Sequence, residues 1–214
     1  MKTDALIAML AQGPLVVPRR AVGHRLLAAI AIGAALAALV MLATLHLRAD
    51  LAAALHVPMF WLKLAVPLVV AALAIAALRR LARPGGRAGS AVALGATFLA
   101  LLAACAVADV VIAPAAERAA LVLGKTALPC VSIVAALSLP TLVAAFVALR
   151  SLAPTRLAAA GAAAGALAGG VGAAVYAWHC NEMTLPFVAV WYVLGMAIPA
   201  ILGAVLARRW LHWS

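Results

Sequence analysis

The sequence contains few charged residues and very few acidic ones. Only 10% of its 214 residues are charged, and only five residues are Asp or Glu. A soluble globular domain is about a quarter charged and about half apolar, whereas 69% of this chain is hydrophobic. Because so much apolar surface cannot be hidden inside a water-soluble body of this size, the composition predicts an integral membrane protein.

The chain also lacks the motifs that usually carry catalysis or metal binding. Its three cysteines form no CxxC, and there is no HExxH, no glycine-rich phosphate loop, no Ser-His-Asp set and no paired catalytic carboxylates. These absences argue against a thioredoxin-type redox pair and against a zinc knuckle. We therefore expect neither an enzyme nor a bound cofactor.

Long apolar runs occur from one end of the chain to the other. They predict an all-α protein with six transmembrane helices arranged as three hairpins. Each run is near the ~20 residues needed to cross the hydrocarbon core, where only helices satisfy the backbone. The expected spans cover roughly residues 25–46, 58–80, 90–112, 129–150, 155–177 and 186–208. The transmembrane domain is then 24–209, between an N-terminal segment (1–23) and a short C-terminus (210–214).

The basic residues are distributed unevenly between the two sides of these spans. Twelve of the sixteen Lys and Arg residues fall on the side that holds both termini. By the positive-inside rule, both termini are predicted to be cytoplasmic. The net charge of +11 is thus explained by topology signals and anionic lipid headgroups, and we expect no direct contact with nucleic acid.

The N-terminal segment has a short amphipathic stretch. Leu6, Ile7, Met9 and Leu10 form an apolar face near Asp4. One interpretation is a helix that lies in the membrane interface. The other is a docking peptide that places this face in a groove of a cytoplasmic partner.

The polar segment Trp178-His179-Cys180-Asn181-Glu182 interrupts the apolar sequence between the last two spans. Cys180 therefore lies at the outer face, as does Cys130 at the start of the fourth span. The two could form a disulfide in an oxidising compartment if their Cα atoms come within about 7 Å. The alternative is two unrelated thiols. Cys105, in the third span, is expected to be a small core residue.

His179 and Glu182 flank Cys180 and are candidate metal ligands. Thiolate and imidazole suit soft or borderline ions such as zinc and cadmium. No ligand spacing here is diagnostic, and interface residues are the simpler interpretation.

Lys63 is a charged residue near the start of the second span. Its ammonium could reach outwards to the headgroups, or pair with Asp109 near the outer end of the third span. An intramembrane pair of this kind usually marks an ion path.

The fifth span contains Gly161, Gly165 and Gly169 at intervals of four residues. One face of this helix therefore has no side chains, which predicts that another helix approaches it closely.

Several segments together resemble a known family over essentially the whole chain. They are Thr3-Asp4-Ala5-Leu6-Ile7, Pro58-Met59-Phe60-Trp61-Leu62-Lys63, Cys130, Trp178-His179-Cys180 with Glu182, Phe187, Trp191-Tyr192 and Leu194-Gly195. In order and spacing they are similar to the NrsF family of bacterial integral-membrane anti-sigma factors.

The resemblance implies a protein of the bacterial inner membrane that holds an extracytoplasmic-function sigma factor inactive. It implies release of this partner under oxidative or heavy-metal stress, with Cys130 and Cys180 as the matching sensor cysteines. Cys105 does not match the family pattern. Two other functions are a membrane thiol oxidoreductase, against which the lack of CxxC argues, and a small transporter, against which the shortage of polar groups in the spans argues.

Overall fold

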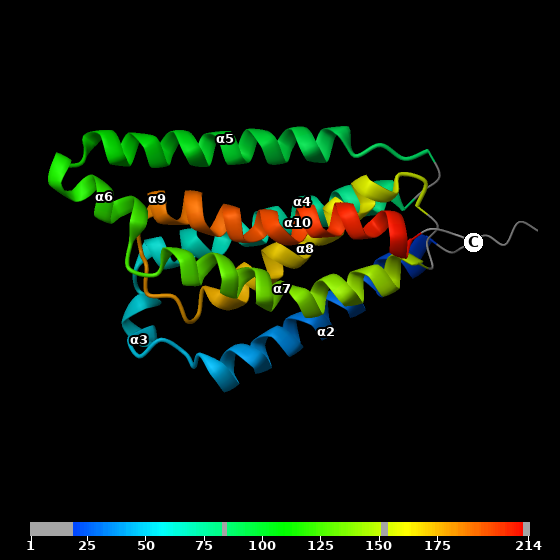
Figure 1. Cartoon of the computed structure of the whole chain (residues 1–214), viewed down its shortest axis with the longest axis horizontal. Coiled ribbons are helices and arrows are strands. Elements are labelled where there is room, and N and C mark those ends of the chain that lie inside the picture. Colours follow the sequence, from blue (N-terminus) through cyan, green and yellow to red (C-terminus); the bar gives the residue numbers. More distant parts are fainter. Residues whose placement is uncertain (1–18, 83–84, 151–153, 212–214) are drawn as a thin grey trace, which may run out of the picture.

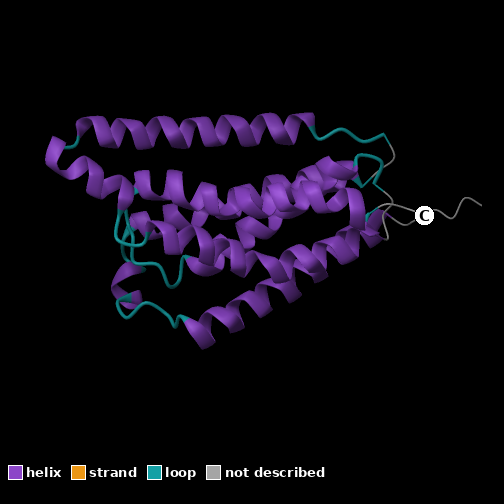
Figure 2. Cartoon of the chain, in the orientation of Figure 1, coloured by secondary structure: helices purple, strands orange, loops and turns teal. Residues whose placement is uncertain are grey.

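The computed structural model describes residues 19–82, 85–150 and 154–211, and these residues form helices and loops without any strand (Figures 1 and 2). The helices are α2 (Arg19–Thr44), α3 (Leu51–Ala54), α4 (Pro58–Leu81), α5 (Gly89–Ile112), α6 (Ala115–Leu123), α7 (Ala127–Arg150), α8 (Leu157–Tyr176), α9 (Leu185–Phe187), the π-helical turn η1 (Val188–Tyr192) and α10 (Val193–Trp210). The predicted all-α class is confirmed.

Six helical segments in the described residues are long and apolar enough to cross a membrane, as predicted. Their bounds lie within a few residues of the expected ones, except that α2 already begins at Arg19. Two short helices, α3 and α6, were not predicted from the sequence. Both lie in connections between spans, where they are too short to be recognised from hydrophobic periodicity.

Helix α8 lies at the centre of the bundle and packs against α10, α7 and α4. Its glycines explain why the neighbours come so close. A Cβ atom added to Gly161 would lie 2.1 Å from the carbonyl oxygen of Gly203, and one added to Gly165 would lie 1.9 Å from that of Pro199. A Cβ added to Gly170, on another face, would meet the carbonyl oxygen of Pro67 at 2.7 Å. The predicted close approach to the fifth span is confirmed.

The hairpin arrangement holds most clearly for α8 and α10, which pack along each other. Helix α8 also packs on α7, which precedes it, whereas α2 and α4, the expected first hairpin, have little contact. The remaining principal contacts join helices that are not consecutive: α2 packs on α7, and α4 packs on α8. Helix α5 lies at the edge of the bundle (Figure 1) and buries only Ala91, Leu102 and Ala106. Its remaining surface is largely apolar and suits contact with lipid.

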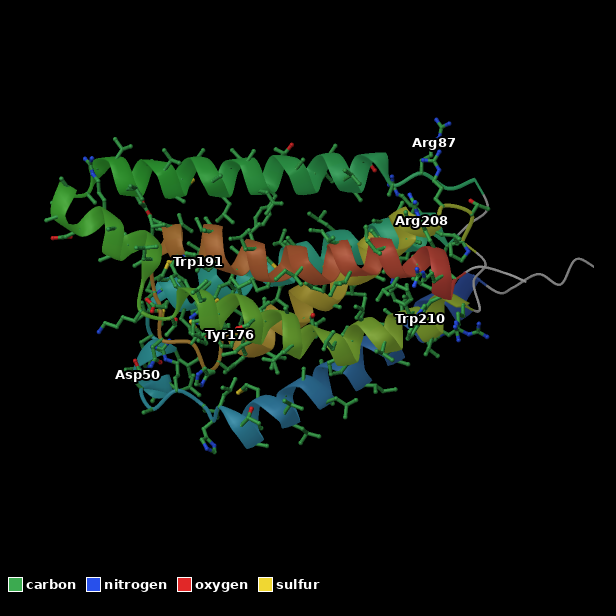
Figure 3. All side chains as sticks on the ribbon, viewed as in Figure 1. Asp50, Arg87, Tyr176, Trp191, Arg208 and Trp210 are labelled. Carbon is green, nitrogen blue, oxygen red and sulfur yellow. The ribbon has the colours of Figure 1, made fainter. Side chains whose placement is uncertain are left out.

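The two ends of the bundle differ in charge. The chain enters α2 and leaves α10 at the same end, where α4, α7 and α10 finish in arginines (Figure 1). Arg87 and Arg208 lie at this end and Asp50 at the other (Figure 3). We refer to the two ends of the bundle as the arginine end and the cysteine end, because Cys130 and Cys180 lie at the second.

Candidate functional site

The two cysteines singled out in the sequence belong to one buried cluster at the cysteine end. Cys130 lies in the first turn of α7, and Cys180 lies in the loop after α8. Their exposed fractions are 0% and 3%, and both pack in the same apolar core as Tyr176 and Tyr192. Both are free thiols. The structure thus brings together two residues that are fifty positions apart in the sequence.

Cys105 does not share this environment. It is exposed on α5, so the expectation of a core position is wrong. The physical reason is that α5 contacts the bundle along one narrow face, and Cys105 lies outside that face.

Lys63 is fully buried, and its ammonium is held by the loop that carries Cys180. Its Nζ donates to the carbonyl oxygens of Cys180 at 2.6 Å and Glu182 at 2.9 Å. The same nitrogen lies 5.5 Å from the centroid of the Tyr192 ring. Both expectations for Lys63 are therefore wrong: it neither reaches the headgroups nor pairs with Asp109. Backbone carbonyls are its partners, and these have no signature in the sequence.

Asp109 lies in the last turn of α5 and is exposed. Together with Met59, Ile112 and Met183 it lines a cavity of about 460 Å³ beside the loop that follows Cys180. In the part of the chain that the structure describes, the ion pair found is Arg48 with Asp50. The predicted intramembrane pair is thus replaced by one in the connection between α2 and α4.

Arg48 is a functional candidate that sequence reasoning missed. Its side chain is buried, with Nε and Nη2 each donating to the Asp50 carboxylate at 2.7 Å. Nη1 donates to the carbonyl oxygen of Cys180 at 3.3 Å, and the Arg48 amide donates to that of Trp178 at 3.2 Å. In the sequence, Arg48 could have been singled out as one of the few basic residues on the outer side of the spans, two positions before Asp50.

Hydrogen bonding between the two side chains raises the pKa of the Arg48 guanidinium and lowers the pKa of the Asp50 carboxyl from its ordinary value of 3.8. Arg48 therefore stays charged at any physiological pH. The loop of Cys180 is bound by two basic side chains, Lys63 from α4 and Arg48 from the connection before it.

His179 and Glu182 have partners other than a metal. The Nδ1 atom of His179 lies 2.9 Å from the carbonyl oxygen of His46. Glu182 Oε1 accepts from the amide of Lys125 at 2.7 Å and from Thr126 Oγ1 at 3.2 Å. No group of three His, Cys, Asp or Glu side chains that could hold a metal occurs among the described residues. The expectation that these two residues ligate a metal is therefore not supported.

The loop from Cys180 to Glu182 is consequently held on both sides. Its carbonyl groups are bound to α4 through Lys63, and its carboxylate is bound to the start of α7 through Thr126. Two buried aromatic rings complete the cluster. The centroids of the Tyr176 and Tyr192 rings lie 6.0 Å apart, and Tyr176 is labelled in Figure 3. Tyr192 ends the π-helical turn η1, a feature that is frequent at functional sites, and its buried hydroxyl has no hydrogen-bond partner in the described residues.

The residues expected to bind a cytoplasmic partner, Asp4, Leu6, Ile7, Met9 and Leu10, lie outside the described residues. The arginine end is the end at which the described chain begins.

Acid should weaken the contact between Asp50 and Arg48. The folded pKa of Asp50 lies below its ordinary value, so the pair stabilises the fold above that value, and the contribution is lost as the pH falls through the folded pKa. We expect Asp50→Asn to lower the melting midpoint slightly at pH 7, and the difference from the native protein to disappear as the pH falls through the folded pKa of Asp50. A difference that is unchanged by acid would contradict the role of this ion pair.

Comparisons with known proteins relate the whole chain to one family. Residues 10–213 match the NrsF family, described as negative regulator of sigma F. The chain is 43% identical over 214 residues to "Probable anti-sigma-F factor NrsF" of Azospira oryzae, and 34% identical over 214 residues to "Anti-sigma-F factor NrsF" of Caulobacter vibrioides. Each match covers 100% of both proteins.

No solved structure matches the chain. The family assignment therefore rests on sequence similarity along the whole length of the protein, and the arrangement of the helices comes from the structure described above. With nearly every residue inside the family match and two relatives aligned from end to end, the chain belongs to the NrsF family of negative regulators of sigma F.

Proposed function

We propose that this protein is an anti-sigma factor of the bacterial inner membrane. It holds an extracytoplasmic-function sigma factor inactive and releases it when an oxidant or a soft metal reacts with Cys130 and Cys180. Family membership supports the anti-sigma role, and six apolar helices support a place in the membrane.

The charge distribution supports an orientation with the arginine end in the cytoplasm. Helices α4, α7 and α10 all finish in arginines at that end, and basic residues are retained on the cytoplasmic side of a membrane. Cys130 and Cys180 would then lie buried at the periplasmic end of the bundle, in a compartment where thiols can be oxidised and disulfides persist.

The observation that carries the sensing proposal is the shared burial of the two thiols in one cluster. Oxidation by a peroxide would proceed in two balanced steps. One thiolate attacks the peroxide oxygen and breaks the O–O bond to give a sulfenic acid and, after protonation, water (from hydrogen peroxide) or an alcohol (from an alkyl hydroperoxide). The second thiol then displaces water to give the disulfide. The peroxide receives the two electrons. A soft metal ion would instead displace both protons and bind the two thiolates.

Either reaction alters the packing around the cysteines. A disulfide draws the start of α7 and the loop after α8 to a fixed Cα separation. Helix α8 leads from Cys180 to the arginine end and contacts α10 through its glycines. We propose that this central helix transmits the change across the membrane.

Release requires that the modified and unmodified proteins differ in affinity for the sigma factor. A difference of ~1.4 kcal/mol changes binding about tenfold. The capture surface in this proposal combines the apolar N-terminal residues with arginines of the inner loops. The first would provide contact area and the second would provide charge complementarity to an acidic surface.

The proposal predicts that a sigma factor co-purifies with the protein from membranes and is lost when oxidant is added. Leu6→Asp combined with Leu10→Asp should reduce the recovered sigma factor at least about tenfold, because charges replace the apolar face. Gln12→Asp adds a charge to the same segment without removing an apolar contact, and should retain the partner. If the double variant, Gln12→Asp and the native protein all recover the same amount of sigma factor, the capture surface lies elsewhere. If the native protein recovers no sigma factor, the anti-sigma role is refuted.

A further inference from the structure

The connection between α2 and α4 holds the loop that carries Cys180, and we call its residues 46–50 the clasp. The Arg48 amide donates to the carbonyl oxygen of Trp178 at 3.2 Å. The Arg48 guanidinium donates through Nη1 to the carbonyl oxygen of Cys180 at 3.3 Å. One residue of the clasp therefore binds the loop with both its backbone and its side chain.

Two further contacts fix the clasp in this position. The Asp50 carboxylate accepts from Nε and Nη2 of Arg48 at 2.7 Å each, which orients the guanidinium and leaves Nη1 for the loop. His46 has a φ of 60°, which is uncommon for a residue other than glycine and persists only where the surroundings hold it. Its carbonyl oxygen lies 2.9 Å from Nδ1 of His179. Since a carbonyl oxygen can only accept, Nδ1 is the donor, and the loop itself holds the strained backbone.

Cys180 is buried although it lies in a loop and not in a helix. A solute cannot touch its thiol in this conformation, so a reaction requires a local opening of the loop. Space for such a movement exists next to the loop. Met183, Thr184 and Leu185, which follow it in the chain, line the cavity of about 460 Å³. The loop therefore has a clasp that holds it and an empty volume beside it.

We propose that Arg48 is a positioning residue that keeps the Cys180 loop closed and thereby sets how fast a solute reaches the thiol. The observed reaction rate is then the rate of the free thiol multiplied by the fraction of time for which the loop is open. Lys63 binds the same carbonyl group from the fully buried part of α4 and anchors the loop to the core. Arg48 binds it from the outer connection, where the Asp50 side chain is exposed, so the contact with Arg48 is the one that opens first.

Alkylation of Cys180 by N-ethylmaleimide measures access to the thiol without any sigma factor. The detergent-purified full chain carries Cys105→Ser and Cys130→Ser, and mass spectrometry follows the modified fraction with time. Arg48→Met keeps an unbranched stem but has no donor, and it should increase the rate at least about tenfold, because the hydrogen bond from a charged group to the loop is lost. Removal of a positive charge near a thiol would by itself slow alkylation, so a faster reaction reports access.

Arg118→Met is the matched control. This arginine of α6 also donates to two backbone carbonyl groups at the cysteine end, those of Ala113 and Val111 at 3.0 Å each, but neither belongs to the clasp or the loop. Arg118→Met should therefore react at the native rate. Asp50→Asn weakens the orientation of Arg48 and leaves its guanidinium in place, and should increase the rate about threefold. If Arg48→Met does not fold, the comparison of Asp50→Asn with Arg118→Met decides the question.

Alkylation at the native rate in Arg48→Met, or equal acceleration by Arg118→Met, would overturn the positioning role of Arg48. The use of this role in sensing rests on the proposed function, but the control of access does not. With all three cysteines present, Arg48→Met should release sigma factor at about tenfold lower peroxide. Faster alkylation without any sigma capture would refute the anti-sigma proposal and leave the role of Arg48 intact. Unchanged alkylation with normal release would do the opposite.

Discussion

Substitution of Gly165 by alanine should lower the melting midpoint of the protein by roughly 2–12 °C. The added Cβ would lie 1.9 Å from the carbonyl oxygen of Pro199 and 2.5 Å from its carbonyl carbon. These are backbone atoms of α10, so no side chain can rotate away, and the two helices must separate. Overpacking costs about 1–3 kcal/mol, and each kcal/mol corresponds to about 2–4 °C for a protein of this size.

Thermal unfolding in detergent, monitored by size-exclusion chromatography after heating to each temperature, measures this change in melting midpoint. Gly95→Ala is the matched control, because a Cβ there meets only Leu73 Cδ1 at 3.8 Å, an ordinary contact. Alanine also favours the helix over glycine by about 1 kcal/mol, so Gly95→Ala should melt at or slightly above the native midpoint. If Gly165→Ala melts together with Gly95→Ala, the close contact between α8 and α10 does not contribute to stability as we describe.

Replacement of Cys130 and Cys180 by serine should abolish the response to oxidant and to soft metals while leaving capture of the sigma factor intact. Serine is close to cysteine in size but can neither form a disulfide nor provide a thiolate for a soft ion. Because both cysteines lie at the end of the bundle opposite the arginine end, their loss removes the signal and not the capture surface. In the native protein, we expect oxidant or a soft metal to increase the released sigma factor at least about tenfold. In the double serine variant, we expect no increase.

A transcriptional reporter of the sigma factor, measured with and without cadmium or a peroxide, gives the response directly. Cys105→Ser is the control: this thiol is exposed on α5, away from the buried pair, and its loss should leave induction unchanged. Normal induction in the double serine variant would refute sensing at these cysteines. Constitutive activity in that variant would show that the thiols also maintain the capturing conformation.

The sequence alone determined the fold class and the number of spans. Apolar run length is a local property, and lipid permits only a hydrogen-bonded helix for each run. The six spans were therefore predictable, as was the close helix approach at Gly161, Gly165 and Gly169. The two cysteines were identified from family resemblance, since their spacing left unrelated thiols as an alternative.

Tertiary structure decided which groups meet. Lys63 binds the carbonyl group of a residue 117 positions away, and every residue has such a carbonyl, so no pattern of side chains predicts this partner. Arg48 reaches the same oxygen across 132 positions. Asp109 was the acid that a charge argument selects for Lys63, yet the position of α5 at the edge of the bundle leaves it exposed. Local chemistry thus specified the helices, whereas the shape and contacts of their packed faces specified the site.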